Sequence, residues 1–154
     1  MKRMLQKWLV SSAEDRCLAI RSLFALPRLS FLLRNSGYSC QHARPGELPL
    51  VIRSLAPPEE QILHARAAAD IVNGVAARLP FQAKCLVRSV YLRRTLAERG
   101  IVTSLKIGVR IERLTLDAHA WVECCGTPIN DSANVTDRFA DMEAAPSYEI
   151  SAFK

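Results

Sequence analysis

The feature that most constrains the fold is one helix followed by short strands in the second half of the chain. Residues 82–98 carry apolar side chains at helical spacing, and Gly100 is a typical C-terminal stop. Residues 101–111 then alternate apolar and polar side chains as a strand does, and further strands are predicted at 117–123 and near 128–132. The second half of the chain is thus predicted to be a helix, a strand and a hairpin.

The first half of the chain is predicted to be mainly helical. Residues 1–42 contain helical patterns in which Pro27 ends one helix or starts the next. A connector rich in proline follows at 43–58, and a long helix is predicted at 58–79. Arginines mixed with the apolar residues of the first region would suit docking to a partner or a membrane surface, but packing on the chain's own domain is the favoured interpretation.

Composition narrows the class of protein. The 154 residues suit one domain, with or without a small helical appendage, and the 49% hydrophobic content is that of a globular protein. The net charge of +6 suits a solvated basic surface or an acidic partner, but no nucleic-acid-binding motif is present. The five cysteines are an odd number, and no apolar run approaches ~20 residues. We therefore expect a cytoplasmic protein with free thiols and no membrane association.

Cys85 is a candidate nucleophile because it falls near the predicted start of the helix. Unpaired backbone N–H groups and the helix dipole favour a thiolate there, and Lys84 adds a positive charge. The Cys85 N–H would also be a natural oxyanion donor, and the Gln82 side chain is a second candidate for that role. A lone cysteine is more often a small buried hydrophobe, so this assignment depends on its partners.

His119 and Asp131 are the predicted partners. A three-residue loop at Cys124–Cys125–Gly126 would set residue 123 opposite 127 and residue 119 opposite 131. The imidazole and the carboxylate would then share one face with Cβ atoms ~5 Å apart. A two-residue turn at Cys125–Gly126 would instead shift the register by one and send Asp131 to the other face.

These residues together indicate a Cys-His-Asp triad. Cys85 would attack a carbonyl, His119 would transfer the proton, and Asp131 would fix the tautomer and orientation of the ring. Trp121 lies on the same predicted face as His119 and would either contact substrate or pack in the core, with packing slightly favoured. No phosphate-cradling loop is present, and neither a metal nor another cofactor is expected.

The segments RRTLAERGI, LKIGVR, AHAWVE and IND, downstream of a cysteine that opens a helix, resemble the lasso-peptide leader peptidases. The similarity is dense from about Pro80 to Ser132. It implies a papain/transglutaminase-like α+β fold, in which the catalytic helix packs on a small antiparallel sheet. It also implies that the triad is Cys85, His119 and Asp131. On this basis residues 1–56 would be an N-terminal helical region and connector, and residues 57–154 a transglutaminase-like cysteine protease domain.

The resemblance also implies a function and partners. The protein would remove the leader from a lasso-peptide precursor, and a separate ATP-dependent lasso cyclase would close the freed core. The first 80 residues lack the strands of a fused leader-recognition domain. This favours a stand-alone protease that needs a separate leader-recognition protein. The adjacent Cys124 and Cys125 depart from the polar turn expected there.

Two other functions remain open from the sequence alone. A thiol acyltransferase or transglutaminase could use the same three residues, with an amine in place of water attacking the thioester. A non-catalytic module could instead bind acidic peptide or nucleic acid through its positive charge.

Overall fold

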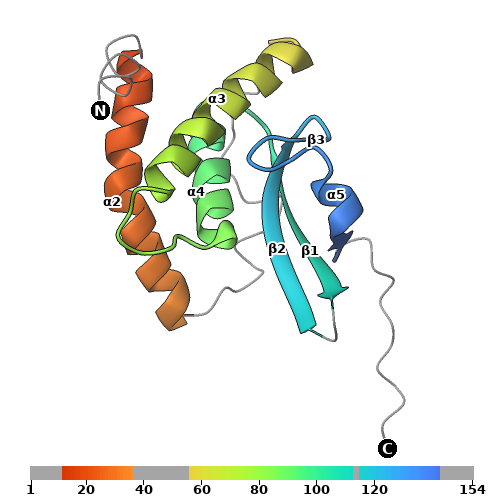
Figure 1. Cartoon of the computed structure of the whole chain (residues 1–154). Coiled ribbons are helices and arrows are strands. Elements are labelled where there is room, and N and C mark those ends of the chain that lie inside the picture. The colour runs from red at the N-terminus through yellow and green to blue at the C-terminus, as the bar shows by residue number, and fades with distance from the viewer. Residues whose placement is uncertain (1–11, 37–55, 113–114, 143–154) are drawn as a thin grey trace, which may run out of the picture.

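The computed structural model describes residues 12–36, 56–112 and 115–142, and it confirms the predicted α+β class. The elements are α2 (Ala13–Ser36), α3 (Pro58–Ala76), α4 (Cys85–Glu98), β1 (Ser104–Glu112), β2 (Thr115–Cys124), β3 (Thr127–Pro128), α5 (Val135–Arg138) and β4 (Ala140–Asp141). Figure 1 shows α2, α3 and α4 on one side of the sheet and α5 on the other. Most of the expected connector at 43–58 lies outside the described residues.

The strands form one antiparallel sheet in the order β3-β2-β1-β4. Its centre is the long β1–β2 hairpin, whose pairing runs from Ser104 opposite Glu123 to Glu112 opposite Thr115. The strand β4 was not predicted, because the last twenty residues were expected to be irregular cover with one helical turn near residues 137–143. It pairs with β1 because Met142 donates its backbone N–H to the carbonyl of Ile107 at 2.9 Å, so the chain returns to the sheet after α5.

The helices and the sheet enclose the main core. Buried side chains from α2, α3 and α4 pack with β-sheet residues such as Leu105, Val122 and Cys124. A smaller cluster of Trp121, Val135 and Phe139 lies apart from it and joins β2 to the segment around α5. Because Trp121 and Val122 are neighbours on one strand, the two clusters occupy opposite faces of the sheet.

Pro27 does not end a helix, contrary to the expected break in this region. It lies inside the 24-residue helix α2. Proline removes one helical hydrogen bond, but packing on both sides of it can hold the helix in register. Leu18 and Leu26 before it are fully buried, and Leu29 and Leu33 after it pack against the same core.

The core contacts of α2 join the N-terminal region to the rest of the protein. The cluster that contains Leu18 and Leu26 also contains residues of α3 and α4. The division of the chain between residues 56 and 57 stays a prediction. Among the described helices, none is both long and apolar enough to cross a bilayer.

The structure places the start of α4 more precisely than the sequence pattern did. The helix begins at Cys85, three residues later than predicted, because Lys84 has the extended backbone of an N-cap residue. The Lys84 side chain makes no capping hydrogen bond, and the first turn carries no acidic residue. The first backbone N–H groups of α4 therefore receive no acceptor from the N-cap side chain.

Candidate active site

The hairpin between β2 and β3 has a two-residue turn, so the predicted three-residue loop is wrong. Cys124 pairs with Thr127 and Glu123 with Pro128, and Cys125 and Gly126 form the turn with φ values of 51° and 75°. Positive φ at both central residues is typical of the tight turn that suits the twist of a β-hairpin. Continued along the strand, this register would set Asp131 opposite Ala120, on the face away from His119.

The strand leaves the ladder before it reaches Asp131. Ile129 still donates its N–H to the carbonyl of Val122 at 3.0 Å. The N–H of Val122, however, donates to Oδ1 of the Asn130 side chain at 2.8 Å. The third strand is therefore only Thr127–Pro128, shorter than the predicted 128–132. The Asn130 side chain thus replaces a backbone group as the hydrogen-bond partner of β2. The side chain of Asp131, the next residue, therefore does not follow the alternating directions of a strand.

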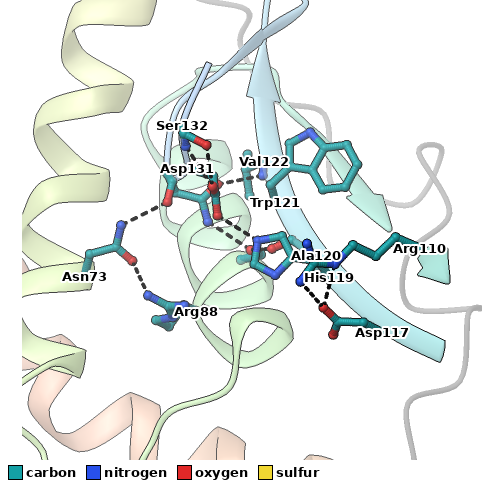
Figure 2. Close-up of polar contacts among 12 residues, drawn as sticks. Asn73, Arg88, Arg110, Asp117, His119, Ala120, Trp121, Val122, Asp131 and Ser132 are labelled. Carbon is teal, nitrogen blue, oxygen red and sulfur yellow. Dashed lines mark hydrogen bonds and ion pairs between the residues drawn. The ribbon is translucent and has the colours of Figure 1, made fainter. Parts of the chain in front are cut away.

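As a result, His119 and Asp131 meet. Nε2 of His119 lies 2.7 Å from Oδ2 of Asp131, and about a quarter of each side chain is exposed. Figure 2 shows the imidazole turned toward this carboxylate. The other carboxylate oxygen, Oδ1, accepts a hydrogen bond from the Ser132 backbone N–H at 2.7 Å. Each oxygen of Asp131 thus has its own donor, which leaves Nδ1 of His119 available for another partner.

The environment of Asp131 favours its charged form. Burial alone would raise the pKa of this carboxyl group, but the hydrogen bond with His119 and those from Ser132 outweigh burial and hold the pKa below its usual value. Asp131 is therefore ionised at neutral pH, as a residue that orients an imidazole must be.

Aromatic packing holds the other side of the imidazole. The ring of His119 stacks on Phe139 with centroids 4.9 Å apart, and Trp121 lies farther along at 6.4 Å. Gly108 pairs with His119 across the β1–β2 ladder. A Cβ atom at residue 108 would lie 2.8 Å from Phe139 Cβ and 2.8 Å from Trp121 Cζ3, so these rings occupy the space that a side chain would need.

Cys85 is the first residue of α4 and is half-buried. One turn along the same helix face, Ser89 donates its hydroxyl to the carbonyl of Ala120, next to His119, at 3.0 Å. A short loop leads from the end of α4 to the start of β1 at Ser104, so α4 and β1 run in opposite directions. Because β2 is antiparallel to β1, with Glu123 opposite Ser104, β2 runs in the same direction as α4. In Figure 1 α4 lies beside β2.

This arrangement displaces Cys85 and His119 in the same direction along β2 from the contact between Ser89 and Ala120. Four residues of helix span about 6 Å, so Cys85 lies about that far from the level of Ser89, toward the start of β2. His119 is displaced from Ala120 in the same direction by about 3.3 Å. Within the described ranges, no hydrogen bond links the Cys85 thiol to His119. Of the three predicted triad residues, His119 and Asp131 are the two that are in contact.

The remaining predicted site residues lie outside this contact. Gln82 is exposed in the segment before α4. Trp121 is only 1% exposed, and its indole N–H donates to Glu123 at 2.8 Å, which agrees with the packing role that the sequence slightly favoured. Cys124 is buried, and desolvation together with Cys125 raises the pKa of its thiol to about 11. The described residues include no cluster of three or more histidine, cysteine, aspartate or glutamate side chains that would suit a metal.

The sequence analysis overlooked three residues that shape the site: Asn130, Ser89 and Phe139. Asn130 was visible only as part of the IND segment, and nothing in a strand pattern indicates that its side chain leaves the ladder. Ser89 carried a usable signal, since it is a polar residue one turn after Cys85 on the predicted helix. Phe139 lies in the last part of the chain, where no site residue was predicted.

Comparison with known proteins agrees with this architecture. A family model described as "Transglutaminase-like superfamily" matches residues 25–144, which include Cys85, His119 and Asp131. The microcin J25-processing protein McjB of Escherichia coli is 40% identical over 60 residues. The aligned segment covers 39% of this chain and 28% of that protein, so the chain spans less than a third of its relative. These matches confirm the resemblance seen in the sequence.

No solved structure matches the chain. The family model nevertheless spans well over half of the 154 residues. This chain belongs to the transglutaminase-like superfamily.

Proposed function

We propose that this protein is a cysteine peptidase in which Cys85 is the nucleophile, His119 the general base and acid, and Asp131 the orienting carboxylate. The observation that carries the proposal is the 2.7 Å contact between His119 Nε2 and Asp131 Oδ2, near a helix that begins at a cysteine. A carboxylate, an imidazole and a thiol are the groups that a thiol peptidase needs.

The reaction follows from these positions. The thiolate of Cys85 attacks the carbonyl carbon of the scissile peptide bond, and the free backbone N–H groups at the start of α4 stabilise the oxyanion. Because Asp131 holds Nε2, Nδ1 of His119 exchanges the proton with the thiol and then donates it to the leaving amine. A water molecule, deprotonated by His119, cleaves the resulting thioester. This step releases the new carboxylate and restores the thiol.

We propose a lasso-peptide precursor as the substrate, with its leader as the part removed. Similarity to a microcin J25-processing protein supports peptide processing. In this proposal the protein works in the cytoplasm, where a separate leader-recognition protein delivers the precursor and a lasso cyclase closes the released core. It requires no cofactor for cleavage itself.

The test is cleavage of purified precursor peptide, analysed by mass spectrometry, with the leader-recognition protein present. Cys85→Ala and His119→Ala are expected to abolish cleavage and to remain folded. Cys125→Ala is the matched control, because this cysteine is exposed in the hairpin turn, and it should cleave normally. Unimpaired cleavage by Cys85→Ala would refute the proposal, as would binding of the precursor without any cleavage by the wild type.

Membership of the transglutaminase-like superfamily also favours a second candidate, acyl transfer through the same thioester. The same experiment distinguishes the two when a soluble primary amine is added. A peptidase gives a free carboxylate at the new terminus, whereas an acyltransferase gives the amide of the added amine.

A further inference from the structure

The loop that carries Asp131 is anchored by hydrogen bonds from three elements, and all of them meet at Asn130. This residue uses its side-chain oxygen, its side-chain nitrogen and its backbone carbonyl. It lies directly before Asp131 and touches neither His119 nor Cys85 among the described contacts.

The side chain of Asn130 connects β2 to the nucleophile helix. Oδ1 accepts the N–H of Val122 at 2.8 Å, and Nδ2 donates to the hydroxyl of Ser89 at 2.9 Å. Ser89 in turn donates to the carbonyl of Ala120. One amide thus bonds to the strand that carries His119 and to the helix that carries Cys85.

The backbone of Asn130 is fixed separately by α3. Its carbonyl accepts Nδ2 of Asn73 at 3.1 Å, and Oδ1 of Asn73 accepts Nη1 of Arg88 at 3.1 Å. Arg88 lies next to Ser89 on α4, so the chain of contacts returns to the same helix. With its carbonyl and its side chain both bound, Asn130 has little freedom to rotate, and neither has the peptide that leads into Asp131.

We propose that Asn130 is a positioning residue that sets the distance and angle between Asp131 and His119 relative to the Cys85 helix. This inference rests on the proposed peptidase function. Without the Asn130 side chain, the strand would tend to continue in its ladder register, which directs residue 131 toward the face away from His119. Misplacement of a catalytic group by about 1 Å can reduce a rate by about 10²-fold.

The test compares Asn130→Ala with the matched control Asn134→Ala, since Asn134 is exposed and makes no side-chain cap bond. Precursor cleavage by Asn130→Ala should fall by about 10²-fold in kcat with little change in KM. The pKa of the Asp131 carboxyl, followed by carbon NMR, should rise toward its ordinary value in Asn130→Ala and stay low in Asn134→Ala. A purely structural role for Asn130 would not change this pKa.

A double-mutant cycle strengthens the test. Asn130→Ala should slow the Asp131→Asn variant far less than it slows the wild type, because the residue that it positions is already lost. Equal effects in the two backgrounds, or an unchanged Asp131 pKa, would overturn the proposal. If Asn130→Ala fails to fold, Asn73→Ala keeps the Asn130 side chain and removes the donor to the Asn130 carbonyl, together with the acceptor of Arg88. It should raise the Asp131 pKa in the same direction. Because the NMR readout needs no substrate, it judges this inference even if the peptidase function fails.

Discussion

His119 Nε2 lies 2.7 Å from Asp131 Oδ2, although the register of the hairpin between them directs the two positions to opposite faces of the sheet. The contact exists because β3 ends at Pro128 and the side chain of Asn130 takes the next hydrogen bond of β2. The site thus depends on where a strand stops as much as on which residues it contains.

The first prediction concerns the charge at residue 131. Asp131→Asn keeps the shape of the side chain but removes the negative charge, and its amide can present a donor to His119, which would reverse the tautomer that the thiol needs. We expect kcat/KM for precursor cleavage to fall by about 10³–10⁴-fold. Asp137→Asn, at an exposed residue of α5, should leave the rate unchanged and is the control. A loss below about tenfold would exclude an orienting role for Asp131.

The second prediction concerns stability in acid. The pKa of Asp131 is lower in the folded state than its unfolded value of about 3.9, so its ionised form stabilises the fold. This contribution is complete well above pH 4 and is lost as the pH falls through the folded-state pKa. Asp131→Asn should therefore lose stability at neutral pH and converge with the wild type in strong acid. Parallel curves of unfolding free energy against pH for the two proteins would contradict this.

The third prediction concerns the packing beneath His119. Gly108→Ala places a methyl group within 3 Å of Phe139 and Trp121, so the rings must move, and we expect a loss of about 1–3 kcal/mol in unfolding free energy. Gly74→Ala is the matched control. In helix α3 its new Cβ would meet only the flexible end of Arg78 at 3.4 Å, and alanine should stabilise the helix by about 0.5–1 kcal/mol. Opposite signs for the two variants in denaturant unfolding are the expected result.

Sequence patterns predicted well those elements that local periodicity determines. The spacing of apolar residues gave α3, α4 and the β1–β2 hairpin because each of them buries one continuous face. The passage of α2 through Pro27 could not be predicted in this way, since packing on α3 and α4, which lie far along the chain, holds the helix together.

The candidate site shows the same limit. The pairing of His119 with Asp131 was predicted from a hairpin register that is wrong, and the contact arises through Asn130 instead. A side chain that replaces a backbone partner leaves no periodic trace in the sequence. The position of β4 was missed for a similar reason, because two residues are too few to show alternation.

The fourth prediction concerns the buried thiol in the hairpin. Cys124 is fully buried, and desolvation raises the pKa of its thiol to about 11, so almost none of it is thiolate at pH 8. Iodoacetamide should label the exposed Cys17 and Cys125 in the native protein and reach Cys124 only after unfolding. Peptide mass spectrometry resolves the sites. Labelling of Cys124 as fast as Cys125 would show that the hairpin opens in the native state.

The fifth prediction concerns the turn itself. Cys125 has a φ of 51°, a conformation that costs most side chains about 1 kcal/mol or more and that asparagine tolerates far better. Cys125→Asn creates the Asn-Gly pair that favours such turns, and we expect it to stabilise the protein by about 1 kcal/mol. Gly126→Ala should destabilise it by a similar amount. Nothing lies within 4 Å of the added Cβ, so that loss would come from the backbone alone. We expect the denaturant midpoints of the two variants to shift in opposite directions at constant m-value. A destabilised Cys125→Asn would show that the cysteine side chain contributes to stability although it is exposed.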